Sequence, residues 1–255
     1  MEELLAMNRK FGALRDVHDV RDRMYRAVPR APVPQYADLR EWGGPIKDQG
    51  DDGSCTGHAF SSAREWMSRK YDKTSPVLSP QCLYVEELIA SGVFPNDDGA
   101  MPRMGCHELT TKGCCETSQY PYVAGQLTVP TPAQAENALK YKTGGYHRIG
   151  TLTDFLRCLA DPTPWPVTVG FTVYESFMTQ QVADTGMMPI PKPGEQPQGG
   201  HEVLCLGYLL PQQLALMQNS WGDGWGQKGY FWMPLETITA PDTDLWMVHT
   251  GGPWK

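Results

Sequence analysis

Apolar and polar positions follow two different periods along the chain, one in each half. From Cys55 to Met67, apolar residues recur at helical spacing directly after Gly53-Ser54, which predicts an amphipathic helix ending near residues 70–73. Capping residues with nearby proline or glycine mark further helices. These predicted helices cover residues 80–89, 104–112, 130–139 and 152–160, and a short one is expected in residues 2–10.

Four segments of the second half have the alternation or the β-branched content typical of strands. They are residues 166–173, 203–208, 214–218 and 229–233. Short connections between neighbouring strands favour antiparallel pairing. The sequence therefore predicts an α+β fold, with a mainly helical lobe at residues 35–125, a mainly β lobe at 126–255 and a cleft between them.

Composition and net charge restrict the class of binding partner more than they restrict the fold. The 255 residues, 40% of them hydrophobic, suffice for one large domain with two lobes. The net charge of −7 disfavours nucleic acid or an anionic membrane as a partner. The sequence has no apolar run long enough to span a bilayer, and the acidic start MEELLAMNRK does not resemble a secretory signal. We therefore expect a cytoplasmic location, with a virion-associated or exported protein as the alternative.

The stretch QGDDGSCT holds the first candidate for chemistry. Cys55 falls at the predicted helix N-terminus, where free N–H groups and the helix dipole favour the nucleophilic thiolate. The alternative is a buried structural cysteine, which is common among free thiols. His58 lies one turn further along the same helix without an orienting partner, so it is disfavoured as a catalytic base.

Two later stretches supply a base and a group that orients it. His201 follows two glycines in GGHEVLCLGY, and Asn219 begins NSWGDGWGQKGY, which is too rich in glycine to be simple strand. A Cys–His pair needs a third group to hold the imidazole, and an asparagine carboxamide can do this. The order Gln49, Cys55, His201, Asn219 therefore predicts nucleophilic catalysis.

These motifs resemble those of the papain-like cysteine peptidases, the family of papain and the cathepsins. The resemblance rests on the spacing from Gln49 to Cys55, on GGH at His201 and on NSWGDGWGQKGY, with weaker matches at LSPQCLY and SQYPY. It implies a helical lobe, an antiparallel β-barrel-like lobe and an active site in the cleft between them. It also implies a thiol endopeptidase that hydrolyses polypeptides through an acyl-enzyme and needs no cofactor.

The resemblance gives each matching residue a role. Cys55 would be the nucleophile, His201 the base and then the acid, and Asn219 the group that orients His201. The Gln49 side chain and the Cys55 backbone N–H would form the oxyanion hole, which matters because charge develops on that oxygen only in the transition state. Trp221 would shield the hydrogen bond between His201 and Asn219 from water.

Further residues are implied in substrate binding. Gly99 resembles a glycine whose backbone pairs with an extended substrate, and Gly200 would offer its carbonyl near the scissile bond. Glu202 follows His201 where the family usually has a small residue, at the pocket for the second residue before the cleaved bond. One hypothesis is that Glu202 favours Lys or Arg there; the other is that it turns to solvent or pairs with a local cation.

The chain also departs from papain and the cathepsins. Asp52 and Thr56 stand where those enzymes have a disulfide cysteine and a tryptophan, and GSCT resembles the bacterial branch. More polar surroundings of Cys55 are therefore expected. The remaining cysteines do not match the family's disulfide positions, so reduced thiols are expected.

A metal site is not expected. The four candidate ligands lack the paired C-x-x-C spacing of common zinc sites. They are Cys106, His107, Cys114 and Cys115.

Residues 1–34 form an N-terminal extension rich in charge and then in proline. It is too short for the long helical prosegment of the cathepsins. The favoured interpretation is an arm packed on the domain surface, and the second is a regulatory arm that lies across the cleft.

Two other functions stay open at this point. The first is another Cys/His amide hydrolase, such as a peptidoglycan amidase or an exopeptidase. The second is a non-catalytic binding or structural protein that keeps the fold. The sequence does not determine the oligomeric state.

Overall fold

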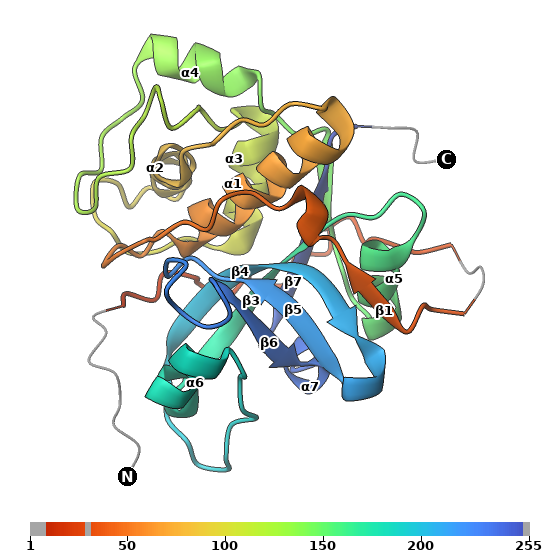
Figure 1. The fold of residues 1–255 in the computed structure, drawn as a ribbon. Helices are drawn as coiled ribbons and strands as arrows, with labels where there is room; N and C mark the ends of the chain where they lie inside the picture. The colour runs from red at the N-terminus through yellow and green to blue at the C-terminus, as the bar shows by residue number, and fades with distance from the viewer. Residues whose placement is uncertain (1–8, 29–31, 252–255) are drawn as a thin grey trace.

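The computed structural model describes residues 9–28 and 32–251 (Figure 1). The helices are α1 (Cys55–Met67), α2 (Pro80–Ala90), α3 (Pro102–Thr111), α4 (Pro132–Leu139), α5 (Leu152–Ala160), α6 (Gln180–Thr185) and α7 (Leu235–Ile238). The strands are β1 (Tyr36–Asp38), β2 (Gly145–Arg148), β3 (Val167–Tyr174), β4 (Pro197–Leu209), β5 (Leu214–Gln218), β6 (Tyr230–Pro234) and β7 (Asp244–His249). The predicted helices from residue 55 to residue 160 are confirmed, whereas the one in residues 2–10 lies mostly outside the described residues.

Helix α1 is the central helix of the first half. All of its residues are buried, because α2 and α3 pack on one part of its surface and β4 on another. The amphipathic pattern therefore understates its burial. Polar groups on α1 are paired internally instead, as when Arg64 donates to the Ser68 hydroxyl at 2.7 Å. The helix continues as a wider turn and ends before Lys73, which has a left-handed φ of 57°.

Helices α2 and α4 begin where their capping residues predict. The Ser79 hydroxyl accepts from the Cys82 N–H at 3.2 Å, with Pro80 at the first helical position. Thr131 and Gln134 form a reciprocal capping box at the start of α4. These starts are set by local chemistry, so the sequence predicts them well.

The strands form one antiparallel sheet in the order β2-β7-β3-β4-β5-β6, and β1 pairs with β4. The four predicted strands are confirmed, whereas β2 and β7 were not predicted. In the part of the chain that the structure describes, β2 and β6 are the edges of the sheet. The sheet is thus open rather than closed into the barrel-like form that the family resemblance implied.

Strand β4 begins earlier than its apolar run suggests. It starts at Pro197, and its first residues pair with β3, including Gly199 with Val173 and His201 with Phe171. Glycines weaken a strand and hide it from a propensity argument. His201 therefore lies inside the strand, where pairing with β3 fixes its backbone, and the pairing of β4 with β5 begins three residues later, at Leu204.

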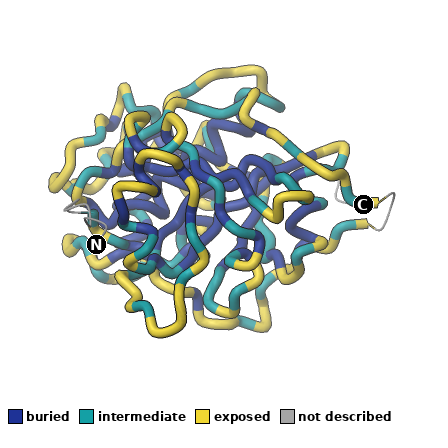
Figure 2. Tube along the Cα trace, turned by 60° about the horizontal axis from the view of Figure 1, so that its bottom comes forward, coloured by how far each residue is buried: buried dark blue, intermediate teal, exposed yellow. Residues whose placement is uncertain are grey.

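The helices α1–α3 and the sheet share one hydrophobic core. Phe60 and Trp66 of α1 belong to the same buried cluster as residues of the sheet, such as Val169 and Phe231. Buried segments accordingly run through the middle of the molecule, with exposed loops around them (Figure 2). The two lobes are a division of the secondary structure over a continuous core, which holds their facing residues in fixed positions.

The N-terminal arm, here residues 9–28, lies along the domain in an extended conformation. Residues 9–16 pass between the two lobes, and Met24 then forms a parallel bridge to Arg148 at the end of β2. The favoured sequence interpretation, an arm on the outer surface, is wrong for residues 9–16. Strand β4 and the segment before α3 offer backbone groups there, at Gly200 and Ala100, which the sequence of the arm does not reveal.

Candidate active site

Cys55 is the first residue of α1, and its side chain is completely buried. The residue before it, Ser54, has φ −89° and ψ 20° and makes no side-chain cap, so the first N–H groups of the helix are left for other partners. Helix N-termini stabilise negative charge. The sequence Gly53-Ser54-Cys55 thus places a thiol where ionisation is favoured once water or substrate reaches it.

His201 and Asn219 are brought together by the pairing of β4 with β5. Asn219 directly follows β5, and its Oδ1 lies 2.8 Å from His201 Nε2. The same oxygen accepts the Ser220 N–H at 2.9 Å, so the carboxamide oxygen faces the imidazole and Nε2 donates. His201 Nδ1 is buried and has no hydrogen-bond partner among the described residues. This nitrogen is therefore the one free to act as a base.

Trp221 covers this pair. Its indole stacks on the His201 ring with centroids 4.9 Å apart and an angle of 28°. Trp225 meets Trp221 edge-on at 5.0 Å, and both are nearly inaccessible to solvent. An apolar cover lowers the local dielectric and strengthens the hydrogen bond beneath it. The glycines of NSWGDGWG allow the tight turns that bring the indoles of Trp221 and Trp225 into contact.

Gln49 is held across the lobe boundary. Its Oε1 accepts the Ser220 hydroxyl at 2.6 Å, and its backbone N–H donates to the Ser220 carbonyl at 2.9 Å. The Nε2 group is left to donate to the Asp52 carbonyl at 2.9 Å and to the Lys10 carbonyl of the arm at 3.2 Å. The amide nitrogen of Gln49 therefore already binds a peptide oxygen.

The arm pairs with backbone groups of both lobes. The Ala13 N–H donates to the Gly200 carbonyl at 3.0 Å, so the carbonyl singled out in the sequence binds a peptide. On the other side, the Ala100 N–H donates to the Gly12 carbonyl at 2.8 Å and the Ala100 carbonyl accepts from Leu14 at 2.9 Å. The backbone that pairs is thus that of Ala100, one residue after Gly99.

Gly99 does not pair with the arm through its own N–H, which is bound to another group. Its N–H donates to the Tyr84 hydroxyl at 3.1 Å, and its φ is 81°. A Cβ on Gly99 would lie 2.4 Å from the Gly12 carbonyl oxygen. Glycine at this position therefore lets another backbone approach closely, while a direct hydrogen bond of Gly99 to substrate stays a prediction.

Close approach of the arm covers the nucleophile. A Cβ on Gly12 would lie 1.7 Å from the Gly53 carbonyl oxygen, so only glycine fits there. Burial raises the pKa of the Cys55 thiol to about 12, although backbone hydrogen bonds from Glu202 and Gly12 act in the opposite direction. The backbone N–H of Gly12 is thus one of the groups that face the thiol, and the arm covers Cys55.

Burial also changes the pKa of the base. It lowers the pKa of His201 to about 4, and the hydrogen bond to Asn219 only partly counters this. With a raised thiol pKa and a lowered imidazole pKa, both groups are neutral near neutral pH. The described state therefore lacks the thiolate–imidazolium pair that attack on a carbonyl requires.

Polar side chains hold residues 9–16 of the arm at both ends of this segment. Arg9 pairs with Asp48 at 2.5 Å, and Lys10 pairs with Asp97 at 2.8 Å. Further along, Asp16 accepts the indole N–H of Trp246 at 2.7 Å. The sequence showed these residues as a charged run, but their partners lie far away along the chain, so the contacts were not foreseeable.

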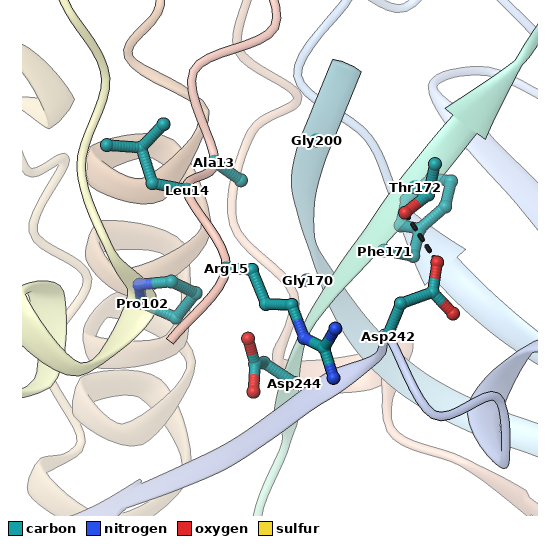
Figure 3. A pocket seen from close by; sticks show the side chains of 10 residues that line it. All are labelled: Ala13, Leu14, Arg15, Pro102, Gly170, Phe171, Thr172, Gly200, Asp242 and Asp244. Carbon is teal, nitrogen blue, oxygen red and sulfur yellow. Dashed lines mark hydrogen bonds between the residues drawn. The ribbon is translucent and has the colours of Figure 1, made fainter. Parts of the chain in front are cut away.

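A small pocket remains beside the arm, with carboxylates on one wall (Figure 3). Its volume is about 50 Å³ with the arm in place. The Arg15 side chain reaches toward Asp242 and Asp244 and donates to the Pro241 carbonyl at 2.6 Å (Figure 3). Gly170 forms the floor, since a Cβ there would lie 2.6 Å from Glu202 Oε2. A cationic side chain therefore already occupies this acidic pocket.

Glu202 is 1% exposed and has no cationic partner among the described residues. The hypothesis that Glu202 turns to solvent or pairs with a local cation is therefore wrong. Burial, with the negative charges of Asp16, Asp244 and Glu87, raises its pKa well above the ordinary value.

Asp52 and Thr56 are used for internal hydrogen bonds. Asp52 accepts from the Tyr122 hydroxyl at 3.0 Å, and the Thr56 hydroxyl donates to Glu87 at 2.5 Å. Both side chains make polar contacts inside the helical lobe, so the polarity expected around Cys55 is directed away from solvent.

All seven cysteines are buried free thiols. Within residues 9–28 and 32–251, no group of three or more candidate ligands is arranged to hold a metal ion. Over the same residues, no helix is long and apolar enough to cross a membrane.

Comparisons with known proteins agree with this geometry. The model of the papain family of cysteine proteases matches residues 33–240. An uncharacterised peptidase C1-like protein of Acanthamoeba polyphaga mimivirus is 31% identical over 213 residues, which are 79% of this chain and 68% of that protein. The thiol protease aleurain of Arabidopsis thaliana is 28% identical over 82% of this chain, which spans 58% of the plant protein.

The comparison with solved structures covers nearly the whole chain. The crystal structure of xylellain, a cysteine protease from Xylella fastidiosa, superimposes with a TM-score of 0.84 and 30% sequence identity. The match covers 95% of this chain and 96% of that chain.

Proposed function

The chain belongs to the papain family of cysteine proteases, and from this premise we propose that it is an endopeptidase whose described state is latent. The observation that supports the activity most directly is the His201–Asn219 hydrogen bond, which leaves Nδ1 free on the imidazole. Latency is supported by the arm, which covers a completely buried Cys55.

The roles of the residues follow from their positions. Once the arm leaves, water reaches the pair, a proton moves from Cys55 to His201 Nδ1, and the thiolate attacks the carbonyl carbon of the scissile bond. The oxygen that becomes negative receives the N–H groups of Gln49 Nε2 and the Cys55 backbone. Lys10 shows that a peptide carbonyl fits against Gln49.

The second half of the reaction reverses the proton transfer. His201 protonates the leaving amine, and the peptide bond breaks to give a thioester on Cys55. A water molecule then loses a proton to His201 as it attacks the thioester, which releases the acid and restores the thiol. Asn219 holds the imidazole plane through both steps, and Trp221 keeps water from its hydrogen bond.

Substrate binding is proposed to reuse the backbone groups that now hold the arm. Gly200 and Ala100 come from opposite lobes and bind an extended segment between them. The pocket with Asp242 and Asp244 would then take the side chain that replaces Arg15. Because both of these residues are acidic and only one of them, Asp244, pairs with Arg148, we propose a preference for Lys or Arg there.

A peptide library tests this preference. The rate with Lys or Arg at the position facing the pocket should exceed that with Leu, and the Asp242→Asn and Asp244→Asn variants should lose the difference. Equal or faster cleavage with Leu in the unaltered chain would contradict the proposal. Ser176→Ala, away from the pocket, is a matched control.

Covalent labelling tests the activity itself. An epoxysuccinyl probe should label the chain slowly while the arm is in place and rapidly after limited proteolysis within residues 9–28, with the label at Cys55. Cys55→Ser should give neither labelling nor turnover of fluorogenic peptides, and Asn219→Ala should reduce turnover. If the opened chain is not labelled, the peptidase proposal fails; turnover of cell-wall fragments instead of peptides would favour an amidase.

A further inference from the structure

A small cavity lies beside Asn219, between α1, β4 and the end of β5. Its volume is about 10 Å³, which is room for one water molecule. His58, Gln218 and Asn219 line it, together with Lys47, Ser62 and Glu202. The reaction proposed above uses Asn219 but gives no part to His58 or Gln218.

Four of the lining residues have buried polar atoms without a hydrogen-bond partner in the described part of the chain. These atoms are His58 Nε2, Gln218 Oε1, Asn219 Nδ2 and both carboxyl oxygens of Glu202. Their residues are 2%, 4%, 3% and 1% exposed, so bulk water does not reach them. The Glu202 carboxyl lies toward Gly170, where a Cβ would be 2.6 Å from Oε2, so the other three atoms are the candidate partners in this cavity. An unpaired buried polar atom costs about 1–3 kcal/mol, which makes three around one cavity an expensive arrangement unless something binds there.

The hydrogen positions on His58 can be assigned from its other contact. Nδ1 lies 2.9 Å from the Ser54 carbonyl oxygen, so Nδ1 carries the proton and donates it. Burial lowers the pKa of His58 to about 3, so the ring is neutral. Its Nε2 therefore presents a lone pair and can only accept.

The hydrogens on the other two residues are complementary. Asn219 Oδ1 already accepts from His201 Nε2 and from the Ser220 N–H, so Nδ2 is a pure donor. Gln218 Oε1 is a pure acceptor. One donor and two acceptors match a water molecule, which has two hydrogens to give and a lone pair to receive.

We propose that this cavity binds one water molecule, which donates to His58 Nε2 and Gln218 Oε1 and accepts from Asn219 Nδ2, and that His58 and Gln218 are positioning residues for Asn219. The functional part of the proposal rests on the roles proposed above for His201 and Asn219.

The water would determine which way the Asn219 carboxamide faces. If the carboxamide turned over, Nδ2 would meet the His201 Nε2–H, donor against donor, and Oδ1 would face the water. With the water held by two acceptors, only its oxygen is left for Asn219, which selects the donor Nδ2. A continuous set of hydrogen bonds then runs from the Ser54 carbonyl, next to Cys55, through His58 and the water to Asn219 and His201.

The Lys47 ammonium, which also lines the cavity, does not compete for this water. Lys47 Nζ donates to Glu65 Oε1 at 2.7 Å and to the Ser61 hydroxyl at 2.8 Å. These contacts hold the ammonium at the wall of the cavity, and they leave the three unpaired atoms as the partners of the bound molecule.

A crystal structure of the full chain that shows ordered water tests the site directly. We expect one water within hydrogen-bond distance of His58 Nε2, Gln218 Oε1 and Asn219 Nδ2. It should be absent in His58→Phe and retained in the matched control Ser62→Ala. An empty or differently bonded cavity in the unaltered chain overturns the proposal, whatever the enzymatic activity proves to be.

The pH dependence of Cys55 alkylation tests the positioning role. In His58→Phe and Gln218→Met, a loosely held Asn219 stabilises imidazolium less, so the alkaline limb of the rate profile should move to lower pH and the rate should fall roughly tenfold. His58→Gln keeps an acceptor at nearly the same reach and should retain the original limb.

The outcomes separate the two proposals. Two variants are used so that a folding failure of one leaves the other, with thermal unfolding as the check. A lowered melting temperature with an unchanged alkaline limb in both variants would show a merely structural role and overturn the inference. Complete lack of Cys55 alkylation in the opened, unaltered chain would overturn the proposed function instead, and the crystallographic result would still stand.

Discussion

The side chain of Gln49 is held in one orientation before substrate binds. Its Oε1 is fixed by Ser220, which leaves Nε2 pointing to the peptide oxygen of Lys10. The amide is therefore set in orientation by the opposite lobe. Such preorganised donors contribute to catalysis because they need no rearrangement in the transition state.

Gln49→Ala is expected to lower kcat on the order of 10²-fold, with a smaller effect on KM, since the donor acts mainly on the charge of the transition state. Steady-state kinetics on arm-released protein would measure this. Ser220→Ala, which frees the orientation but keeps the donor, should lose less. A change confined to KM would contradict the oxyanion-hole role.

At the scale of elements, the backbone of the arm fits the backbone of the segments that it contacts. Gly12 lies against Gly53, and the Ala100 and Gly200 backbones hold the next residues. Backbone contacts of this kind depend little on side-chain identity, so the arm sequence gave no motif for them. A glycine at the closest contact is the one local requirement.

Gly12→Ala should release the arm. The added Cβ would meet the backbone of Gly53, which cannot move aside, and overpacking of this kind costs about 1–3 kcal/mol. Labelling of Cys55 in the full chain should rise roughly 5- to 150-fold. Leu14→Ala, which trims a half-exposed side chain and keeps the backbone bonds, is the control and should label as the unaltered chain does.

Asp16 gives the arm a pH dependence. Burial, and then the charge of Asp244, raises the pKa of Asp16 from 3.8 to about 6 in the docked arm. The docked arm thus holds a proton more tightly than a free arm would, so docking is strongest at low pH and weakens as the pH rises toward about 6. Arg103 and Trp246 also face this carboxyl, and both lower its pKa.

Asp16→Asn should remove this dependence, because the amide stays neutral while making similar hydrogen bonds. The ratio of Cys55 labelling rates, unaltered chain over variant, should be near one at pH 4 and should rise to a plateau above pH 6. Taking the ratio cancels the ionisation of the thiol itself. A ratio that falls with pH would show the opposite linkage.

For the whole molecule, the crossing of α1, α2 and α3 contains a buried acid. Glu87 on α2 is inaccessible to solvent and accepts the Thr56 hydroxyl of α1. Burial raises the pKa of Glu87 to about 8, with a further contribution from Glu108 on α3. The folded chain keeps this proton while an unfolded chain releases it near 4.5, so stability falls as the pH rises from about 4.5 to about 8.

Glu87→Gln should therefore increase the free energy of unfolding, with a larger gain at pH 8 than at pH 5. Urea unfolding at the two pH values measures both gains. Glu136→Gln, at an exposed position of α4, should change neither value appreciably. A gain for Glu87→Gln that is equal at both pH values would show that the carboxyl is not protonated in the fold.

The sequence by itself determined the features that depend on neighbouring residues or on a distinctive motif. Ser79 and Thr131 start their helices through local capping, and apolar periodicity located α1 and the four predicted strands. Cys55, His201 and Asn219 were found because their flanking glycines and tryptophans form an unusual pattern.

Only the tertiary structure decided how distant segments meet. The strands β2 and β7, the place of Ala100 beside Gly12, the burial of Glu202 and the shared cavity of His58 and Gln218 all depend on partners far away along the chain. The arm is the clearest case, since residues 9–16 bind both lobes through backbone groups that every residue carries. Backbone contacts do not require particular residue types, so the sequence does not reveal them. They form only because the packed core holds the two lobes at the right separation.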